Sequence, residues 1–540
     1  SGGNSVSTFG IGATTIIGAA GGTQATGLTK FDASGFNGNL KASFGDSVVD
    51  TSLTVTGGSG ADIIYATYDA AATEVLKVVN VEKIHLLADR GGDSGETYVF
   101  NLAGVTGVTL TSISAGAASA DDSTVTVNNL VSGQTVAMGS TAANGIAAGT
   151  FFGNSSLTAT LADATGTTDA LTLNLVDTDE NAGVGTDQTD FNAAGVEALT
   201  INVAASAEDH DIDLAGVTAT TGSKTSITIT GGLDAGTDAT VDAADAGSML
   251  EINDMSSSVN VFNSSAFNGN VLMTGRHTNS IEITGGIGDD TFRMESASDV
   301  INGGAGTDTL VVAKSAILGG INVDLTNTTD QVVSFNGSAS AGTVLGFENV
   351  DLSGYTGSFG AQIQAGADGS TITGTTNADE ITLTTAKADV VISNDATGDT
   401  ISGFTIGSDI VRLDISEHGT MIEADTTVIA GAVSIEDIAA DTTVSGGANI
   451  FFIAGDYATI ADLDTALTSG AREITMDTGT ATVGEDIYLL YDNGTDSFLA
   501  VANIDGVTGT AVDDVTITNL VTFTGISDAD TLTASEFAFI

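Results

Sequence analysis

The sequence predicts an all-β protein in which parallel β-roll or β-solenoid segments, with short calcium-binding turns, are combined with β-sandwich-like regions. Three observations support this fold class. Short runs in which β-branched residues alternate with Thr and Asn recur along the chain, as in half-buried strands. Clusters of Gly, Asp, Asn and Ser separate these runs. Two glycine–aspartate loops also stand at a spacing that allows them to stack in successive coils.

The alternating runs predict individual strands, and other local signals predict one helix and one hairpin. The helix is expected over 459–468, with Thr459 as its N-cap. The hairpin is expected over 487–501, around the Asn493–Gly494 dipeptide. The clearest predicted strands are 108–113, 123–128, 170–175, 199–203 and 225–230.

The charge balance of the chain is strongly acidic. Its 540 residues include 69 Asp and Glu but only 12 Lys and Arg, for a net charge of −57. Because 41% of the residues are hydrophobic, we expect a folded chain rather than a disordered acidic tail. The few cations argue against nucleic-acid binding. So large a charge destabilises a compact state, which makes bound divalent cations the favoured explanation and a solvated halophile-type surface the alternative.

Other classes are excluded by what the sequence lacks. Cysteine is absent, so the chain forms no disulfides and has no thiolate metal site. No run of 18 apolar residues occurs, so we expect no transmembrane segment. The first residues, SGGNSVSTFG, have no basic n-region, and we expect no cleavable signal peptide there.

An internal repeat divides the chain. The segment FDASGFNGNL at 31–40 recurs as FNSSAFNGNV at 262–271 and more loosely as VDLSGYTGSF at 350–359, each preceding a glycine–aspartate loop. Segments 78–86 and 344–352 form a second shared element. The alternative is convergence in a chain of low complexity. The predicted parts are an N-terminal segment (1–30), a first β repeat with a calcium-type loop (31–95), a β-rich middle region (96–260), a β-roll (261–416) and a C-terminal β domain (417–540).

Two loops fit the pattern G-G-x-G-x-D-x-U-x, where U is a large apolar residue. They are GGIGDDTFR at 285–293 and GGAGTDTLV at 303–311, 18 residues apart. In a parallel β-roll one coil is two such nonapeptides, so these turns should stack and place Asp290 and Asp308 around one cation. Glycine permits the tight turn and exposes backbone carbonyls. A site with six or more oxygen ligands favours Ca²⁺.

Three further segments extend this pattern. Residues 294–302 should form the turn on the opposite side, with Asp299 at the aspartate position and Ile301 pointing inward. A single copy at 57–65 contains Asp62 and must be completed by another segment of the same chain or of a second copy. A degenerate roll at 374–402 should place Asp379 and Asp399 on one side. The candidate calcium ligands and loop glycines are Gly57, Gly58, Gly60, Asp62, Gly285, Gly286, Gly288, Asp290, Asp299, Gly303, Gly304, Gly306, Asp308, Asn377, Asp379 and Asp399.

Weaker acidic loops leave their interpretation open. Residues 177–188 begin like an EF-hand loop but lack its central Gly and final Glu. The Gly-Thr-Asp turns at 185–187, 236–238 and 494–496 are either simple turns or additional calcium loops.

The nonapeptides resemble the calcium-binding repeats of the repeats-in-toxin (RTX) proteins. Residues 401–413 resemble the segment that often ends such rolls, and residues 520–540 look like the C-terminal region of type I-secreted proteins. The repeats are fewer and more interrupted than in toxins. The resemblance implies secretion by a type I system and several bound Ca²⁺ ions.

The predicted function is that of a structural surface-layer (S-layer) protein, similar to those of Gram-negative bacteria that contain RTX repeats. It would assemble with itself on the bacterial cell surface, with an unidentified region contacting lipopolysaccharide. The four histidines lie far apart and form no HExxH motif, and no nucleophile elbow or phosphate loop is found, so we expect no enzyme. The alternatives are a monomeric RTX adhesin and an extracellular enzyme with an unrecognised site.

Overall fold

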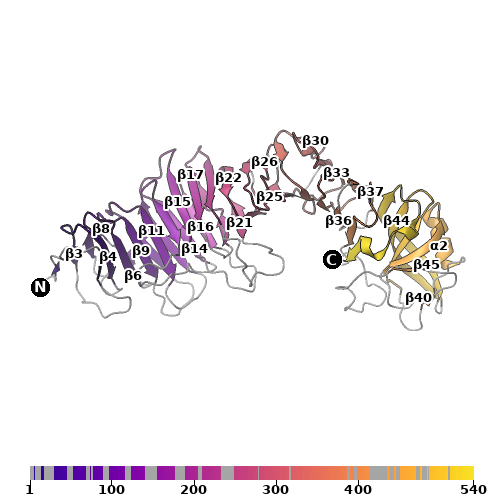
Figure 1. The fold of residues 1–540 in the computed structure, drawn as a ribbon, viewed down its shortest axis with the longest axis horizontal. Helices are drawn as coiled ribbons and strands as arrows, with labels where there is room; N and C mark the ends of the chain where they lie inside the picture. Colours follow the sequence, from indigo (N-terminus) through magenta and orange to yellow (C-terminus); the bar gives the residue numbers. More distant parts are fainter. Residues whose placement is uncertain are drawn as a thin grey trace. The chain divides into compact units, whose positions relative to one another are not determined.

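The computed structural model shows an all-β chain, as predicted, and it divides into two compact units (Figure 1). The first unit comprises residues 1–292 and 303–306, and the second comprises 293–302 and 307–540. The structure describes residues 5–6, 14–17, 29–44, 53–68, 73–74, 77–88, 97–115, 123–139, 155–176, 189–204, 210–232, 249–277, 279–315, 318–385, 389–393, 398–413, 435–437, 443–444, 450–469, 475–476, 483–484, 486–508 and 511–539.

The first unit is a solenoid whose strands pair in parallel with their equivalents in the preceding and following coils. We call its longest sheet the upper sheet: β2 (Thr14–Ile17), β4 (Asn39–Phe44), β6 (Ile63–Tyr68), β9 (Lys83–Ala88), β11 (Leu110–Ala115), β13 (Thr135–Met138), β15 (Ala170–Leu175), β17 (Ala198–Val203), β20 (Thr225–Gly231), β22 (Val259–Phe267) and β24 (Glu282–Thr284).

The first unit contains a second long sheet, which we call the lower sheet. Along the chain, its strands largely alternate with those of the upper sheet. A short third sheet contains β1 (Ser5–Val6), β3 (Lys30–Asp32), β5 (Thr54–Thr56) and β8 (Lys77–Val79). The lower sheet contains β7 (Thr73–Glu74), β10 (Thr97–Asn101), β12 (Thr124–Leu130), β14 (Ser156–Leu161), β16 (Thr189–Ala194) with β19 (Val217–Thr218) beside it, β18 (His210–Leu214), β21 (Met249–Met255), β23 (Asn270–Met273) and β25 (Thr291–Met294).

Period-2 alternation explains why these segments form strands. In β15 the side chains of Leu171, Leu173 and Leu175 are buried, whereas the residues between them are partly exposed. The same pattern recurs in β17 and β20, so each coil buries one row of apolar side chains from each sheet. Parallel pairing places equivalent side chains in columns, which builds a continuous core. The strands of the predicted middle region (96–260) therefore continue the solenoid.

The second unit begins with further parallel coils. One sheet contains β27 (Thr309–Val312), β32 (Asn349–Asp351), β34 (Thr371–Thr373), β36 (Val390–Ser393), β38 (Ile410–Leu413) and β46 (Phe537–Phe539). A second contains β33 (Ala361–Gln364), β35 (Glu380–Thr382) and β37 (Asp399–Ser402), with β28 (Ile321–Asp324), β29 (Val332–Phe335) and β30 (Ser338–Ala339) on one side. In addition, β26 (Val300–Asn302) pairs with β31 (Thr343–Leu345).

The C-terminal part of the second unit changes to mainly antiparallel pairing. The predicted hairpin is confirmed: Tyr491 pairs with Phe498, and Gly494 at the turn has φ +81°. The two strands of the hairpin lie in a sheet with one further long strand and several short ones. The strands are β39 (Ile435–Asp437), β40 (Thr443–Val444), β41 (Ile450–Asp456), β42 (Thr475–Met476), β43 (Asp486–Asp492), β44 (Ser497–Thr508) and β45 (Ala511–Thr524).

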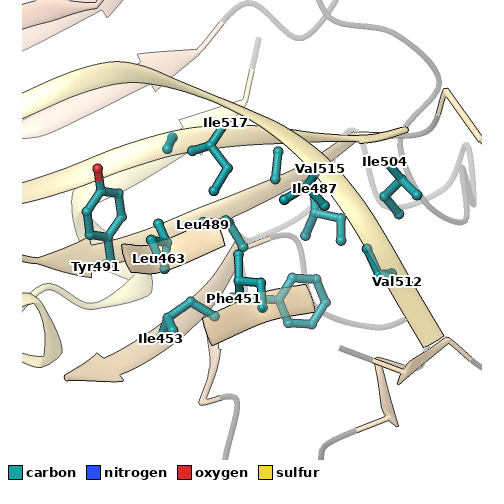
Figure 2. Packing of buried hydrophobic residues seen from close by; sticks show 13 residues of the cluster. Phe451, Ile453, Leu463, Ile487, Leu489, Tyr491, Ile504, Val512, Val515 and Ile517 are labelled. Carbon is teal, nitrogen blue, oxygen red and sulfur yellow. The ribbon is translucent and has the colours of Figure 1, made fainter. Parts of the chain in front are cut away.

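A helix covers one face of this sheet. The predicted helix is confirmed as α2 (Ile460–Thr468), which begins with a capping box between Thr459 and Asp462. Leu463 and Leu467 are fully buried, and Figure 2 shows Leu463 beside Leu489 and Tyr491. The cluster gives this end of the chain its own apolar core.

The last residues of the chain complete the coils. Strand β45 pairs in parallel with β37, and β46 pairs with β38, so both edges of the final coil are covered. Two short 3₁₀ turns, η2 (Ala529–Thr531) and η3 (Ala534–Glu536), connect β45 to β46. Phe537 packs edge-on against Phe523, with 6.2 Å between ring centroids.

This arrangement predicts that Phe537→Ala destabilises the second unit by roughly 3 kcal/mol, because it leaves a cavity at a covered sheet edge. Phe359→Ala removes an aromatic ring that is 45% exposed and is the matched control. Urea unfolding followed by circular dichroism measures both. Equal effects of the two substitutions would contradict the capping role of β46.

Candidate functional site

The buried aspartate of the loop at 57–65 connects two coils. The Leu40 amide from the preceding coil donates to Oδ1 of Asp62 at 2.8 Å, and the Gly58 amide of its own loop donates to Oδ2 at 2.6 Å. Asp62 is completely buried, and both of its carboxylate oxygens accept amides of the same chain.

The repeated segment around Asp290 has the same geometry. Oδ1 of Asp290 accepts the amide of Val271 at 2.8 Å, and Oδ2 accepts the amide of Gly286 at 2.8 Å. The FNGN segments contribute equivalent bonds, because Asn39 accepts the Ala61 amide and Asn270 accepts the Asp289 amide. The internal repeat predicted from the sequence is therefore also a repeat of hydrogen bonding.

The second unit contains two parallel series of such carboxylates. Asp379 accepts the amides of Ala361 at 2.6 Å and Thr375 at 2.7 Å, and its own amide donates to Oδ1 of Asp399 at 3.0 Å. The prediction that Asp379 and Asp399 lie on one side is confirmed. On the opposite side, the Asp389 amide donates to Oδ1 of Asp409 in the same manner. We call these coil-connecting carboxylates, together with Asp62 and Asp290, the acidic ladder.

Three glutamates that we did not predict extend the ladder. The amides of Asp62, Asp169 and Asp308 donate to the carboxylates of Glu82, Glu197 and Glu348, respectively, at 2.7–3.0 Å. Each glutamate amide donates back to the carbonyl of its aspartate. The signal was present in the sequence, because Glu82 and Glu348 lie in the shared segments at 78–86 and 344–352.

The two glycine-rich loops at 285–288 and 303–306 stack within the first unit. The Ala305 amide donates to the Gly286 carbonyl at 3.0 Å. Gly304 and Gly306 have φ of +117° and +142°, and a Cβ on Gly304 would lie 2.3 Å from the Gly286 oxygen. Only glycine allows this approach, which places carbonyl oxygens of one loop against the backbone of the next. A cation shared by Asp290 and Asp308 stays a prediction.

The remaining candidate residues have individual roles. Asp299 is buried where the sequence predicted, and its Oδ2 accepts the amides of Glu295 and Ser296. The side-chain amide of Asn377 donates to the carbonyls of Gly357 and Phe359. Asp496, in the turn at 494–496, accepts the amide of Gly525. The loops at 177–188 and 236–238 and His418 lie outside the described residues.

Burial changes the titration of the ladder. Removal from water raises the pKa of Asp290 to about 6, although two backbone amides oppose the change. Burial likewise raises the pKa of Asp62 and of Asp409. A carboxylate in this position favours either a proton or a metal cation near neutral pH.

One histidine lies in a neutral hydrogen-bonded cluster outside the ladder. The ring nitrogens of His85 lie 2.8 Å from the Ser112 hydroxyl and 2.9 Å from the Ser114 hydroxyl. Burial lowers the pKa of His85 to about 4, so the ring is uncharged at neutral pH. Ser114 is fully buried, and so weak a base suits stabilisation of the fold better than activation of a nucleophile.

Comparisons with known proteins were made for the whole chain. It matches no known family model, and no curated protein matches it significantly. Within the part of the chain that the structure describes, no helix is long and apolar enough to cross a membrane. The described residues also contain no cluster of three or more His, Asp or Glu side chains able to hold a metal ion.

The raised pKa of Asp290 predicts a pH dependence of stability. The carboxyl titrates at 3.8 when unperturbed and at about 6 in the folded chain. Its contribution to stability is therefore complete below pH 4 and is lost as the pH rises through 6, by up to about 3 kcal/mol. Asp290→Asn should remove this component in metal-free urea titrations. Asp289→Asn removes an exposed carboxylate whose charge contributes only a small part of the shift, so it should retain most of the component; identical pH profiles for the two variants would contradict the assignment.

His85 predicts the opposite pH dependence. Its pKa falls from 6.5 to about 4 on folding, so its contribution is complete above pH 6.5 and is lost as the pH falls towards 4. The difference is up to about 3 kcal/mol. We expect His85→Gln to be less stable than the parent at pH 7 but to lose less stability on acidification. Urea midpoints at several pH values measure this, and a variant with the parental pH slope would count against it.

Proposed function

We propose that this protein is a structural surface-layer protein that assembles outside the cell into a calcium-dependent lattice. The observation that carries the proposal is the acidic ladder, in which buried carboxylates connect successive coils at both 57–65 and 285–293 and again in the second unit. Repeated bonds of this kind suit a structural subunit built from stacked coils. The resemblance to RTX-containing S-layer proteins and the net charge of −57 support the same conclusion.

The residues of the loops fit calcium chemically. Their donors are hard oxygens, namely carboxylates and glycine carbonyls, which Ca²⁺ accepts in flexible geometry. A carboxylate oxygen has two lone pairs, so it can contact a cation while it also accepts an amide, as the oxygens of Asp290 do. Bound cations would supply positive charge where burial has raised the pKa of the aspartate. They would also lower the repulsion among the acidic side chains of the chain.

Two other functions remain as alternatives. A monomeric RTX adhesin would use the same calcium-dependent coils without forming a lattice. An extracellular enzyme would need an accessible catalytic group, and the His85 cluster does not favour one because its serine at 114 is fully buried. We favour the lattice protein because the repeated structural bonds extend through both units. Export by a type I system and attachment to lipopolysaccharide belong to the same proposal and follow from the resemblance alone.

The proposal predicts that Ca²⁺ first folds and then assembles the protein. Chelation should reduce the β-type circular dichroism signal, because the aspartates of the stacked loops would lose their counter-ions. Returning Ca²⁺ should restore it and then give reversible light scattering and two-dimensional arrays in electron microscopy. Mg²⁺ should be much less effective, because it requires tighter octahedral geometry and loses water reluctantly.

Matched variants localise this effect. Asp290→Asn should raise the Ca²⁺ concentration required for folding by about tenfold, equivalent to about 1.4 kcal/mol. Asp289→Asn makes the same change of charge at an exposed position and should leave it nearly unchanged. Folded protein that stays monomeric at millimolar Ca²⁺ would favour the adhesin. A chelated protein with an unchanged spectrum would remove calcium from the mechanism.

A further inference from the structure

One face of the solenoid is uncharged in a chain that is otherwise strongly acidic. Six adjacent strands of the upper sheet, β11, β13, β15, β17, β20 and β22, are described throughout and contain no Asp, Glu, Lys or Arg. The flanking strands contain charged residues: Lys83 of β9 pairs with Leu110, and Glu282 of β24 pairs with Val261. We call the outward side chains of these six strands that are at least partly exposed the uncharged face; Ser114 of β11 and Ala137 of β13 also point outward but are buried and do not belong to it.

The side chains of this face form a regular grid. Thr135, Thr172, Thr200 and Thr228 occupy equivalent positions on four consecutive strands, and three of them are the central residues of β15, β17 and β20. All four are partly exposed. A second row contains Asn174, Asn202 and Thr230, in which Asn202 donates to Asn174 and Thr230 donates to Asn202.

The lower sheet of the same unit differs sharply. Acidic side chains lie directly in register there, with Asp190 beside Asp213 and Asp211 beside Glu251. All four are at least partly exposed. In the lower sheet the acidic residues gather on the adjacent strands β16, β18 and β21, which lie at the same level as uncharged strands of the upper sheet.

We propose that the uncharged face is a contact surface for a second copy of this chain. Two copies that each have a net charge of −57 repel one another through most surfaces, and the contact costs least where neither partner presents a charge. Hydroxyl and amide groups both donate and accept hydrogen bonds, so this face can pair with itself around a two-fold axis. A surface of carboxylates, which only accept, cannot pair with itself in this way.

The dimensions of the face suit a reversible dimer. Six strands spaced by about 4.8 Å and about six residues of about 3.3 Å cover at most roughly 500 Å² on each copy, because Ser114 and Ala137 on this side are buried. A pair would bury about 1,000 Å², which is at the lower limit for specific protein–protein interfaces. Small side chains such as Thr, Ser and Ala allow the two sheets to approach closely. We therefore expect a weak dimer rather than a permanent one.

This inference deepens the proposed lattice function, because it names one contact of the lattice. The contact responds to ions differently from calcium bridges. Monovalent salt screens the repulsion between acidic copies, and a rise from about 0.01 M to about 0.1 M shortens the Debye length from about 30 Å to about 10 Å. Association through the uncharged face should therefore strengthen with NaCl at fixed calcium.

The test is sedimentation velocity on the full chain, at the lowest Ca²⁺ concentration that maintains the folded spectrum. Thr200→Glu places a charge at the centre of the face and should weaken the dimer about tenfold or more. Thr158→Glu adds the same charge to the outward side of β14 in the lower sheet and should leave dimerisation unchanged. An equimolar mixture of Thr200→Glu and Thr200→Lys should recover association, because opposite charges then meet.

The outcomes separate this surface from the lattice function. A parent protein that remains monomeric at about 0.1 mM, where micromolar affinities are detected, overturns the surface. So does a Thr200→Glu variant that associates like the parent. If calcium fails to give arrays but the salt-dependent dimer persists, the lattice function fails and the surface stands. If Thr200→Glu forms arrays as readily as the parent, the surface fails and the lattice function stands.

Discussion

The fold depends on a carboxylate that is buried between two coils and accepts backbone amides from both. Asp62 and Asp290 each accept one amide from their own turn and one from the preceding coil. A parallel solenoid bends its backbone at every corner, and the amides at these corners cannot all pair within the ladders of the sheets. The two oxygens of an aspartate satisfy two such amides at once. They thereby fix the register of successive coils as well as the shape of each turn.

The buried aspartates place negative charge inside a protein that is already strongly acidic. Removal from water disfavours the charged form of a carboxylate, which is why burial raises the pKa of Asp290. The same carboxylate is therefore both a structural hydrogen-bond acceptor and the centre of the cation site that we propose. Glu197 behaves differently, because the bonded amides of Thr220 and Asp169 outweigh burial and lower its pKa. The fold therefore favours the protonated form of the Asp290 carboxyl but the charged form of the Glu197 carboxyl.

Local sequence patterns predicted the parts of the fold that depend on local interactions. Alternation located β15 to the residue, and the Thr459 cap located α2, because both signals lie within a few residues of the element. The glycine loops identified Asp62 and Asp290 as candidate ligands, but their complete burial was not predicted. The partners of these carboxylates were not predicted, since Leu40 and Val271 donate only backbone amides, which carry no side-chain signature. Glu197 was missed because its coil lacks a glycine-rich loop, although the Val-Glu dipeptide also occurs at Glu82.

The final coil has a consequence for how the chain reaches its folded state. Asp399 of β37 pairs with Val521 of β45, and Val411 of β38 pairs with Phe537 of β46, whereas earlier coils pair with segments only some tens of residues away. Contacts between such distant segments form slowly, because a long loop must close before they contribute. The coils can therefore grow from neighbour to neighbour, but their last edge stays open until the end of the chain arrives. Completion of this final coil is therefore a step of folding that is not local.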